Sequence, residues 1–381
     1  MGRRTVAIIG ARGIANYGGF ETLVSELAPR LRERGYDIMC SHRWIDQASR
    51  TREFRGVTPL YFPFRFPKSI LLSRFFELLY DWYFLLMCSL WLKCDIVYCL
   101  GTGAGFALPI SNLGRSKTIV NIDGVEWERA KFGRAQRNLI RWLFLFSYLF
   151  SDFILVDNRR LTDYVPVDFQ KKTVFIPYGV TIPECTGIDR ELAEGKSKPV
   201  SYVPKGEEYW LVVARLEPDN NIHTIVKAYS ESRTKKHLLI VGSFSSNQYE
   251  ARVREMLKGL PEGKNVAFSG SIFNQSHLTH LRCHAFAYVH GHSVGGTNPS
   301  LLEAMSVGRA IICHDNVFNR EVCGGSALYF KEAEELARQM DSLEGNRELS
   351  ARLGSEARDI AKTKYGWDGV VDAYDKLFLR V

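Results

Sequence analysis

The residues from His290 to Met305 have the types and the spacing to bind an anion. They read His-Gly-His-Ser-Val-Gly-Gly-Thr-Asn-Pro-Ser-Leu-Leu-Glu-Ala-Met, with a short apolar run before them and a helical apolar pattern over their second half. This order predicts a strand, a Gly-rich turn and a helix whose first-turn N–H groups are unpaired, beside the positive end of its dipole. Such a helix start attracts phosphate. The alternative is an ordinary strand-to-helix turn of an α/β domain.

Two charged residues could complete such a site. Glu303 follows the turn on the predicted helix, where its carboxylate could accept hydrogen bonds from neutral hydroxyls such as those of a ribose. Arg215 directly follows another predicted strand, 209–214, and its guanidinium could bind phosphate oxygens in pairs. The alternatives are a solvated glutamate and a surface ion pair.

A further polar group follows the predicted strand Lys117–Ile122. It contains Asp123, Glu126, Trp127 and Arg129. Ligands of open α/β sheets bind at the carboxyl ends of the strands, so this position favours a binding site. The alternative is a salt-bridged surface turn.

Histidines and cysteines are the remaining candidates for chemistry. His277, His280 and His284 lie near one face of a predicted helix, and Cys283 is adjacent. No acid completes a zinc shell, so we expect neither a metal nor another cofactor. The eight cysteines include no Cys-x-x-Cys pair, and no signal peptide is evident. Reduced thiols in a cytoplasm are the simplest expectation.

The composition is that of a globular protein with an uneven charge. The 381 residues are 46% hydrophobic and 24% charged, which suits two domains of ordinary size. Through Pro183 there are 25 Lys and Arg against 16 Asp and Glu, whereas the rest of the chain is nearly neutral. A basic half could meet nucleic acid, an acidic substrate or an anionic membrane. No nucleic-acid-binding motif is present, so the last two are favoured.

Two stretches of the basic half are rich in apolar and aromatic residues. Residues 69–93 are interrupted by Arg74, Glu77 and Asp81, so no uncharged run is long enough to span a membrane. Residues 141–150 form a shorter stretch of the same kind. Each could be a core helix, or could lie partly inserted in a membrane surface. The sequence leaves both readings open.

The elements that position these residues follow a βα alternation. Residues 1–180 are predicted to form one doubly wound domain and 209–364 a second. Residues 181–208 lack a hydrophobic period and are predicted to be the linker. Residues 365–381 are predicted to contain a C-terminal amphipathic helix.

The first predicted strand, 5–10, ends in a long Gly-rich loop that contains Gly18 and Gly19. The glycines lack the Gly-x-Gly-x-x-Gly spacing, and the next strand ends in two bases instead of the acid that holds an NAD ribose. The sequence therefore argues against a dinucleotide cofactor. In the following helix, about 21–34, Pro29 should cause a kink or a break.

Taken together, these features resemble the GT-B glycosyltransferases of family 4. The motifs at 10–21 and 291–305 are similar to those of the bacterial rhamnosyltransferases of cell-wall and capsule polysaccharide assembly. The resemblance covers nearly the whole chain. It implies an α/β fold of two doubly wound, Rossmann-like domains facing a central crevice, with the C-terminal helix returning to the first domain.

The resemblance also assigns roles. In the second domain, Glu303 would hold the donor ribose and Arg215 would bind and stabilise the leaving phosphate. The acceptor proton would pass to the departing phosphate or to Asp123, the second candidate catalytic residue. The remaining donor-binding residues would be Gly18, Gly19, Gly295, Gly296, Thr297 and Asn298. We also expect Asn220 to contact the donor, and Tyr17, Glu126, Trp127 and Arg129 to bind the acceptor.

Three positions depart from the family pattern. Gly295 stands where the family has its first acid, Asn220 where a lysine is often found, and Asp123 where a histidine is common. The first two remove a contact to the donor sugar and a positive charge near the diphosphate. They would suit an altered sugar such as a 6-deoxyhexose, or a lower activity.

The implied activity is a retaining, metal-independent transfer of a sugar from a nucleotide sugar, with dTDP-rhamnose favoured. The acceptor would be a lipid-linked or other glycan, met in the cytoplasm or at the inner face of the plasma membrane. Two alternatives stay open: a sugar-nucleotide epimerase on the same fold, and a non-catalytic protein that binds nucleotide sugars or glycans.

Overall fold

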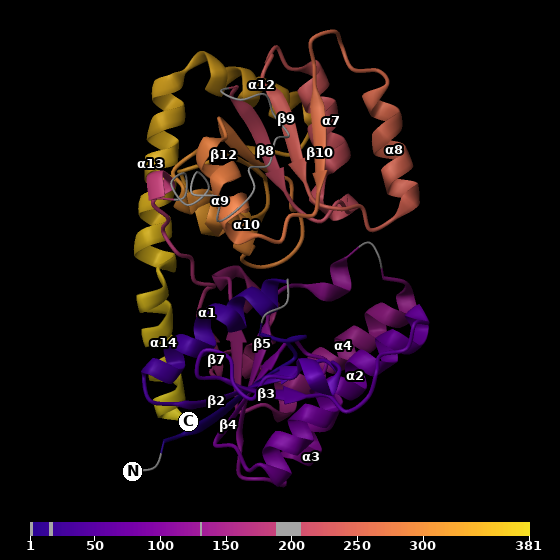
Figure 1. Cartoon of the computed structure of the whole chain (residues 1–381), viewed down its shortest axis with the longest axis vertical. Helices are drawn as coiled ribbons and strands as arrows, with labels where there is room; N and C mark the ends of the chain where they lie inside the picture. Colours follow the sequence, from indigo (N-terminus) through magenta and orange to yellow (C-terminus); the bar gives the residue numbers. More distant parts are fainter. Residues whose placement is uncertain (1–2, 15–17, 130–131, 188–206) are drawn as a thin grey trace. The chain divides into compact units, whose positions relative to one another are not determined.

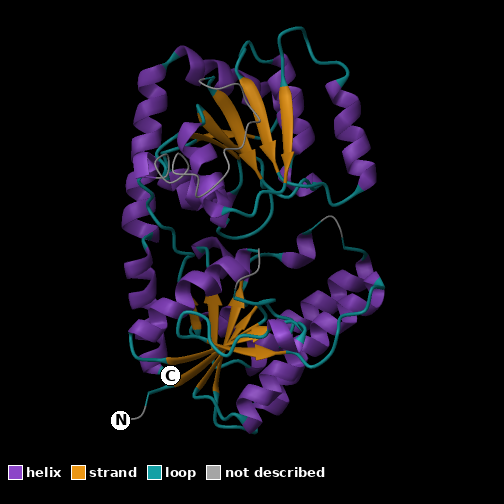
Figure 2. Ribbon diagram, in the orientation of Figure 1, coloured by secondary structure: helices purple, strands orange, loops and turns teal. Residues whose placement is uncertain are grey.

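The computed structural model describes residues 3–14, 18–129, 132–187 and 207–381, which form two compact units. Unit 1 extends to Tyr178 and includes Trp367–Val381, and unit 2 is Gly179–Gly366. Each unit is a parallel β-sheet covered by helices (Figure 1, Figure 2). The predicted α/β architecture of two doubly wound domains is confirmed.

In unit 1 the described strands form one seven-stranded sheet in the order β3-β2-β1-β4-β5-β6-β7. All pairs are parallel, and the chain reverses its direction across the sheet after β3, so β1 and β4 are neighbours at a switch point. Most strands are apolar and buried, as parallel strands covered on both faces require. The bounds are β1 (Thr5–Ile9), β2 (Asp37–His42), β3 (Thr58–Tyr61), β4 (Ile96–Leu100), β5 (Lys117–Ile122), β6 (Phe153–Val156) and β7 (Thr173–Phe175).

The helices of unit 1 form two groups. Because β1 to β2 and β3 to β4 cross the sheet in opposite directions, right-handed connections place α1 and α2 on opposite faces. On one face α1 packs against α14, and on the other α3 packs against both α2 and α4. The bounds are α1 (Gly19–Glu33), α2 (Ile70–Leu86), η2 (Met87–Trp91), η3 (Gly105–Ala107), α3 (Leu108–Ser111), α4 (Arg134–Phe150), α5 (Val167–Gln170) and α14 (Trp367–Arg380), with the short 3-10 turns η1 (Gln47–Ser49), η4 (Glu126–Glu128) and η5 (Arg159–Tyr164).

The C-terminal helix α14 is fixed to unit 1 by both apolar and polar contacts. The Arg30 guanidinium lies 5.0 Å from the Trp367 ring centroid. The hydroxyl of Tyr374 is 2.9 Å from that of Tyr98 on β4, and the Tyr36 hydroxyl donates to Asp375 over 2.6 Å. The apolar side of α14 therefore completes the cover of this face of the sheet.

In unit 2 the described strands form a six-stranded parallel sheet in the order β10-β9-β8-β11-β12-β13. The switch point lies between β8 and β11, which are paired in register through Trp210 and Ala287. The strands are β8 (Tyr209–Val213), β9 (His237–Val241), β10 (Val266–Gly270), β11 (Ala287–His290), β12 (Ala310–His314) and β13 (Leu328–Phe330). The helices are η6 (Pro218–Asn220), α7 (Ile222–Glu231), α8 (Asn247–Leu257), α9 (Gln275–His284), α10 (Pro299–Ser306), α11 (Val317–Cys323), α12 (Ala333–Gly345) and α13 (Arg347–Tyr365).

Two local predictions are wrong or incomplete. Pro29 does not break its helix, because α1 continues from Gly19 to Glu33 with a buried apolar side that includes Leu27 and Leu31. Burial of that side outweighs the lost backbone hydrogen bond. The strands β3, β12 and β13 were not predicted. β3 is short and contains Pro59, a residue tolerated at sheet edges.

The expectation of reduced thiols is wrong for two of the cysteines. Cys185 and Cys283 form a disulfide across 98 residues of sequence, with their Cα atoms 5.8 Å apart. The other six cysteines are free and buried. The pair has no local spacing signal, because only the packing of α9 near the beginning of unit 2 brings the two residues together.

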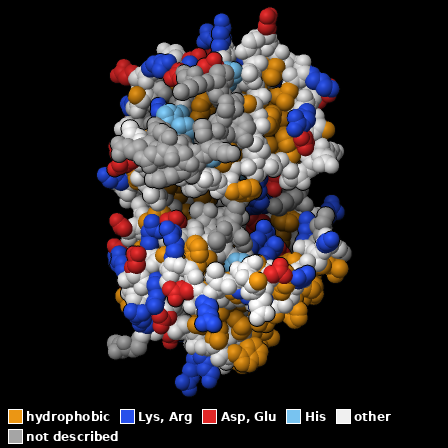
Figure 3. All heavy atoms as spheres, viewed as in Figure 1, with side chains coloured by type: hydrophobic (Ala, Val, Ile, Leu, Met, Phe, Trp, Pro, Cys, Tyr) orange, Lys and Arg blue, Asp and Glu red, His pale blue; other side chains and the backbone are white. Residues whose placement is uncertain are grey.

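Unit 1 also exposes large apolar side chains. They include Trp91 and Leu113, and hydrophobic side chains gather over the region of α2, α3 and α4 (Figure 3). Among the described residues, no helix is both long enough and apolar enough to cross a membrane.

Candidate functional site

The loops after β8 and β11 are joined by hydrogen bonds at the carboxyl edge of the unit 2 sheet. Asn220 is buried, and its Nδ2 donates to the Arg215 carbonyl over 2.7 Å. Its Oδ1 lies 2.8 Å from Nδ1 of His292. The Ser293 amide and hydroxyl both donate to the Asp219 carbonyl. The Asn220 amide group thus joins the two loops, and its contact with the donor stays a prediction.

His292 is in turn fixed by the start of α11. Its carbonyl accepts from Nδ2 of Asn316 and from Nδ2 of Asn319, each over 3.0 Å. The neighbouring His290 is buried on β11, and burial lowers its pKa to about 3. His290 is therefore neutral near pH 7. These asparagines were not predicted, because their partners are backbone atoms far away in the sequence.

Gly295 begins the turn that precedes α10 and has a φ of +122°. A Cβ at this position would lie 3.1 Å from Nε2 of His292. An acid here, as the family pattern has, would need a strained backbone and would crowd the histidine. The position of the His292 ring therefore depends on a glycine at position 295. Gly296 and Thr297 follow in the same turn and are buried.

The first turn of α10 is closed by Asn298. Its Oδ1 accepts from the Ser300 amide over 2.9 Å, and its carbonyl accepts from the Leu301 amide over 3.0 Å. The expectation that these first-turn amides are unpaired is therefore wrong, because the cap satisfies them. The Ser300 hydroxyl donates to the Val213 carbonyl over 3.0 Å, which fixes the start of α10 against the end of β8.

Glu303 lies on α10 and is held by one side of α9. Its Oε2 pairs with Nη2 of Arg282, and its Oε1 accepts from Nε2 of Gln275 over 3.0 Å. The Arg282 side chain is only 2% exposed, whereas that of Glu303 is 21% exposed. A largely desolvated guanidinium thus orients a carboxylate that still reaches solvent. Gln275 and Arg282 were not predicted. The only signal was their spacing of seven residues, which puts them on one side of a helix.

Arg215 follows β8 at the same edge, and its side chain is 62% exposed. Its Nη1 lies 3.7 Å from Oε1 of Glu217, too far for a good hydrogen bond. The guanidinium is thus weakly held and accessible to an anion.

In unit 1 the loop after β1 is closed by Glu21. This buried carboxylate accepts from the Arg12 amide over 2.9 Å. A Cβ on Gly18 would lie 1.9 Å from Oε2 of Glu21, so only glycine fits there. Gly19 begins α1 with open space on its Cβ side. Tyr17 lies outside the described residues.

The residues after β5 largely interact with one another. Glu126 and Arg129 form an ion pair of 2.7 Å, and the Trp127 ring packs edge-on against Phe144 of α4, with centroids 4.6 Å apart. The salt-bridged turn that the sequence left as an alternative is therefore present. Asp123 follows β5 directly and is partly exposed.

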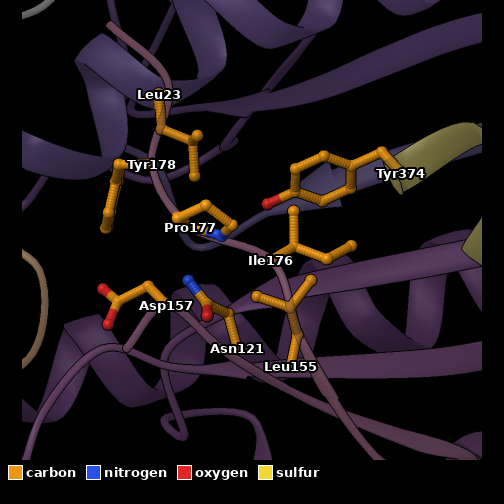
Figure 4. Close-up of a pocket in the computed structure, with 8 residues that line it drawn as sticks. All are labelled: Leu23, Asn121, Leu155, Asp157, Ile176, Pro177, Tyr178 and Tyr374. Atoms are coloured by element: carbon orange, nitrogen blue, oxygen red, sulfur yellow. The ribbon is translucent and has the colours of Figure 1, made fainter. Parts of the chain in front are cut away.

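A narrow pocket lies beside this strand in unit 1 (Figure 4). Leu23, Asn121, Asp157, Tyr178 and Tyr374 are among the residues that line it, and it encloses about 140 Å³ of space between atoms. None of that space admits the centre of a water molecule. This pocket is a gap in the packing of α14 against the sheet and not a ligand site.

A charged cluster lies at the carboxyl edge of the unit 1 sheet. The Arg43 guanidinium pairs with Glu77 of α2, and Nη2 of Arg12 lies 3.8 Å from the same carboxylate. Burial raises the pKa of Asp81, one turn further along α2, to about 7, although Arg43 opposes the shift. The sequence showed Glu77 and Asp81 only as interruptions of an apolar stretch. Their spacing of four residues was the available signal.

The described residues contain no group of three or more His, Cys, Asp or Glu side chains arranged to hold a metal ion. Cys283 is taken by the disulfide, and the His280 and His284 rings pack together with centroids 4.4 Å apart.

Two known protein families match the sequence, one over each half of the chain. Residues 194–360 match the family described as Glycosyl transferases group 1. Residues 3–181 match a domain of unknown function, DUF1972. The candidate site of unit 2 lies wholly within the first match, whereas unit 1 matches a family without an assigned role.

Two curated relatives are similar in sequence. An uncharacterized glycosyltransferase of Methanocaldococcus jannaschii is 22% identical over 241 residues, which is 61% of this chain and 59% of the relative. The O-antigen chain mannosyltransferase C of Escherichia coli is 23% identical over 222 residues, or 55% of each chain. The matches thus span little more than half of the length of these relatives.

Solved structures agree in fold over the whole chain. Sucrose-phosphate synthase from Thermosynechococcus elongatus has a TM-score of 0.80 at 16% identity, with 99% of both chains covered. Anabaena HepE in complex with UDP has a TM-score of 0.73 at 14% identity and covers 99% of this chain and 100% of its own. The chain has the GT-B fold, and the matches together support a glycosyltransferase.

Proposed function

We propose that this protein is a glycosyltransferase that binds a nucleotide sugar on unit 2 and transfers its sugar to a glycan or lipid-linked acceptor. The observation that carries the proposal is the Glu303 carboxylate, held on α10 by Arg282 and Gln275. The match to glycosyl transferases group 1 supports it, and so do the UDP complex of Anabaena HepE and its complex with UDP-glucose.

Glu303 would bind the ribose of the donor. A carboxylate offers about four lone-pair sites, and Arg282 and Gln275 occupy one on each oxygen. The remaining lone pairs of this partly exposed carboxylate could accept hydrogen bonds from sugar hydroxyls. Because Arg282 fixes the carboxylate before the ligand arrives, little conformational entropy is lost on binding.

The diphosphate would lie against the turn Gly295–Thr297, next to Arg215. In the reaction, the bond between the anomeric carbon and the diphosphate oxygen breaks while an acceptor hydroxyl bonds to the same carbon, on the same face. The acceptor proton passes to the departing diphosphate, and Asp123 stays the predicted alternative acceptor. Negative charge that develops on the diphosphate would be stabilised by the Arg215 guanidinium, so the proposal needs no metal ion.

A 6-deoxyhexose donor, with dTDP-rhamnose favoured, is the finer proposal. It is supported by Gly295, because a glycine cannot offer the sugar a carboxylate. The similarity at 10–21 and 291–305 to rhamnosyltransferases of family 4 points the same way. A cell-surface polysaccharide is then the expected product, made at the cytoplasmic side of the membrane.

Thermal unfolding with dTDP-rhamnose, UDP-glucose and GDP-mannose tests donor binding. A ligand at about 100 times its Kd stabilises the folded protein by about 2.7 kcal/mol, so one of these donors should raise the unfolding temperature measurably. Glu303→Gln should abolish the shift. Glu334→Gln is the matched control, because Glu334 is an exposed carboxylate of the same unit, paired with Lys227.

Product analysis then separates the three functions that the sequence left open. Sugar transferred to a lipid extract, lost in Glu303→Gln, supports the proposal. A new nucleotide sugar formed without any acceptor would instead identify an epimerase. Binding without turnover on any acceptor would identify a non-catalytic protein. A Glu303→Gln variant as active as the wild type would refute the proposed site.

A further inference from the structure

The outer side of the α2, α3 and α4 layer of unit 1 exposes large apolar side chains. We define this apolar face by six of them: Leu72, Phe75, Trp91, Leu113, Leu139 and Trp142. The side chains of Trp91 and Leu113 are exposed by 73% and 83%, values unusual for residues of this size. In the described part of unit 2, the exposed large apolar residues are only Phe273 and Val317. An apolar patch of this kind marks an interaction surface.

The three helices behind this face form one continuous layer. The Trp82 ring of α2 contacts Phe106, and Phe106 contacts Phe146 of α4, with centroids 6.4 and 5.0 Å apart. At the far end, Oγ of Ser116 donates to the Cys94 carbonyl over 2.5 Å and joins the turns that carry Leu113 and Trp91. The exposed side chains thus belong to one packed surface and not to separate mobile loops.

The charge of this layer has one sign along α4. The helix carries Arg134, Arg137 and Arg141 and has no acidic residue between 134 and 150. Arg134 and Arg141 are exposed. The acids of α2, Glu77 and Asp81, lie on the opposite side of their helix from Leu72 and Phe75, where Glu77 pairs with Arg43. The apolar face is therefore bordered by positive charge.

A shallow hollow lies on the exposed side of α4 and is lined by Asn138, Arg141, Trp142 and Leu145. It places a guanidinium, an indole and an aliphatic side chain next to one another. This combination suits the boundary between lipid phosphates and acyl chains, where arginine binds phosphate and tryptophan lies at the level of the headgroups.

We infer that the apolar face, with Arg134 and Arg141 beside it, docks unit 1 onto an anionic lipid bilayer. Apolar side chains would enter the headgroup and acyl boundary while the arginines bind lipid phosphates. The positive charge beside the face favours lipid over a second copy of this chain, since two such faces would repel each other. The inference rests on the proposed function in that a lipid-linked acceptor is presented at such a surface.

Flotation of the whole protein with vesicles tests the inference without any nucleotide sugar. Vesicles of phosphatidylcholine with about one-third phosphatidylglycerol should bind the protein, and those of phosphatidylcholine alone should bind it at least tenfold more weakly. Raising the salt concentration should weaken binding to the anionic vesicles, because added salt screens the arginines.

Two variants separate the apolar and the charged parts. Trp91→Glu with Leu113→Glu should weaken vesicle binding at least tenfold. Arg134→Gln with Arg141→Gln should weaken it about fivefold for each arginine. Phe273→Glu is the matched control, because Phe273 is a 67% exposed aromatic residue of unit 2, and it should leave binding unchanged. Far-UV circular dichroism and the unfolding temperature verify that every variant is folded.

The outcomes distinguish this surface from the proposed activity. Vesicle binding with the expected pattern, in a protein that transfers no sugar, would support the surface and refute the activity. Transfer to a detergent-dissolved acceptor without vesicle binding would support the activity and refute the membrane-binding surface. Equal binding by the wild type and the Trp91→Glu, Leu113→Glu variant overturns the inference. So does a dimer, measured by light scattering, that this variant dissociates.

Discussion

The carboxyl edges of the two sheets are built in different ways. In unit 2 the helices that follow β9, β10, β11 and β12 begin with a side-chain cap, from Ser246, Asn274, Asn298 and Asn316. In unit 1, α1, α2 and α4 follow Gly18, Ser69 and Gly133, and none of these residues caps its helix through a side chain. The unit 2 loops are thus fixed by short polar side chains, and the unit 1 loops by longer-range contacts.

The charged groups differ as well. The unit 2 edge contains an ion pair between the buried Arg282 and the partly exposed Glu303, and a neutral buried histidine, His290. The unit 1 edge contains two arginines around Glu77 and a carboxyl group, Asp81, whose pKa is raised. At the unit 2 edge, hydrogen bonds fix the polar side chains, as a donor-binding site would require. At the unit 1 edge, the raised pKa of Asp81 makes the charge of the cluster depend on pH. Four predictions test this difference, from the largest expected effect to the smallest.

Glu303→Met should destabilise the protein by about 3 to 5 kcal/mol, because it leaves the buried Arg282 guanidinium without its partner. The measurement is urea unfolding. Arg233→Met is the control, since Arg233 pairs with Asp341 but has an 88% exposed side chain, and its loss should cost about 1 kcal/mol or less. Equal losses in the free energy of unfolding for the two variants would show that the pair of Arg282 and Glu303 stabilises the protein no more than an exposed ion pair.

Asp81→Asn should change how stability depends on pH. The folded pKa of Asp81 is about 7, above its ordinary value, so the wild type loses stability as pH rises from 4 to 7. The amide cannot ionise. The variant should therefore gain about 3 kcal/mol relative to the wild type over this range, in chemical unfolding at each pH. A constant difference between the two proteins would exclude a buried acid.

His290→Gln should show the opposite sign. The folded pKa of His290 is about 3, below its ordinary value of 6.5, so the wild type loses stability as pH falls below 6.5. Between pH 6.5 and 4.5 the loss should be about 2.5 kcal/mol, and the variant should lack it. Parallel unfolding curves for the two proteins would contradict the neutral, buried histidine at this edge.

Asn298→Ala should cost about 1 kcal/mol, because it removes the cap of α10. Ser69→Ala, at the start of α2, should cost almost nothing, because Ser69 makes no capping hydrogen bond. Thermal unfolding of both variants measures the difference. Similar losses of stability for the two variants would mean that side-chain caps do not distinguish the unit 2 edge from the unit 1 edge.

Much of the fold could be predicted from the sequence. Runs such as Ile96–Leu100 and Tyr209–Val213 are apolar throughout and separated by helical patterns, which is sufficient for parallel strands covered on both sides. Three strands were not predicted. β3 and β13 are short edge strands, each paired with one neighbour, and β12 lies between β11 and β13. Glu303 and Arg215 were also predicted, because each follows a strand or turn at a fixed distance along the chain.

The sequence by itself determined most of the strands and helices and several of the turns, because those depend on local periodicity. Only the tertiary structure decided the partners: Arg282 for Glu303, His292 for Asn220, and Cys185 for Cys283. It also decided that Asp81 and His290 are buried. Such pairings join residues that lie 21 to 98 positions apart. They depend on how helices and loops pack on a completed sheet, and no local pattern records that packing.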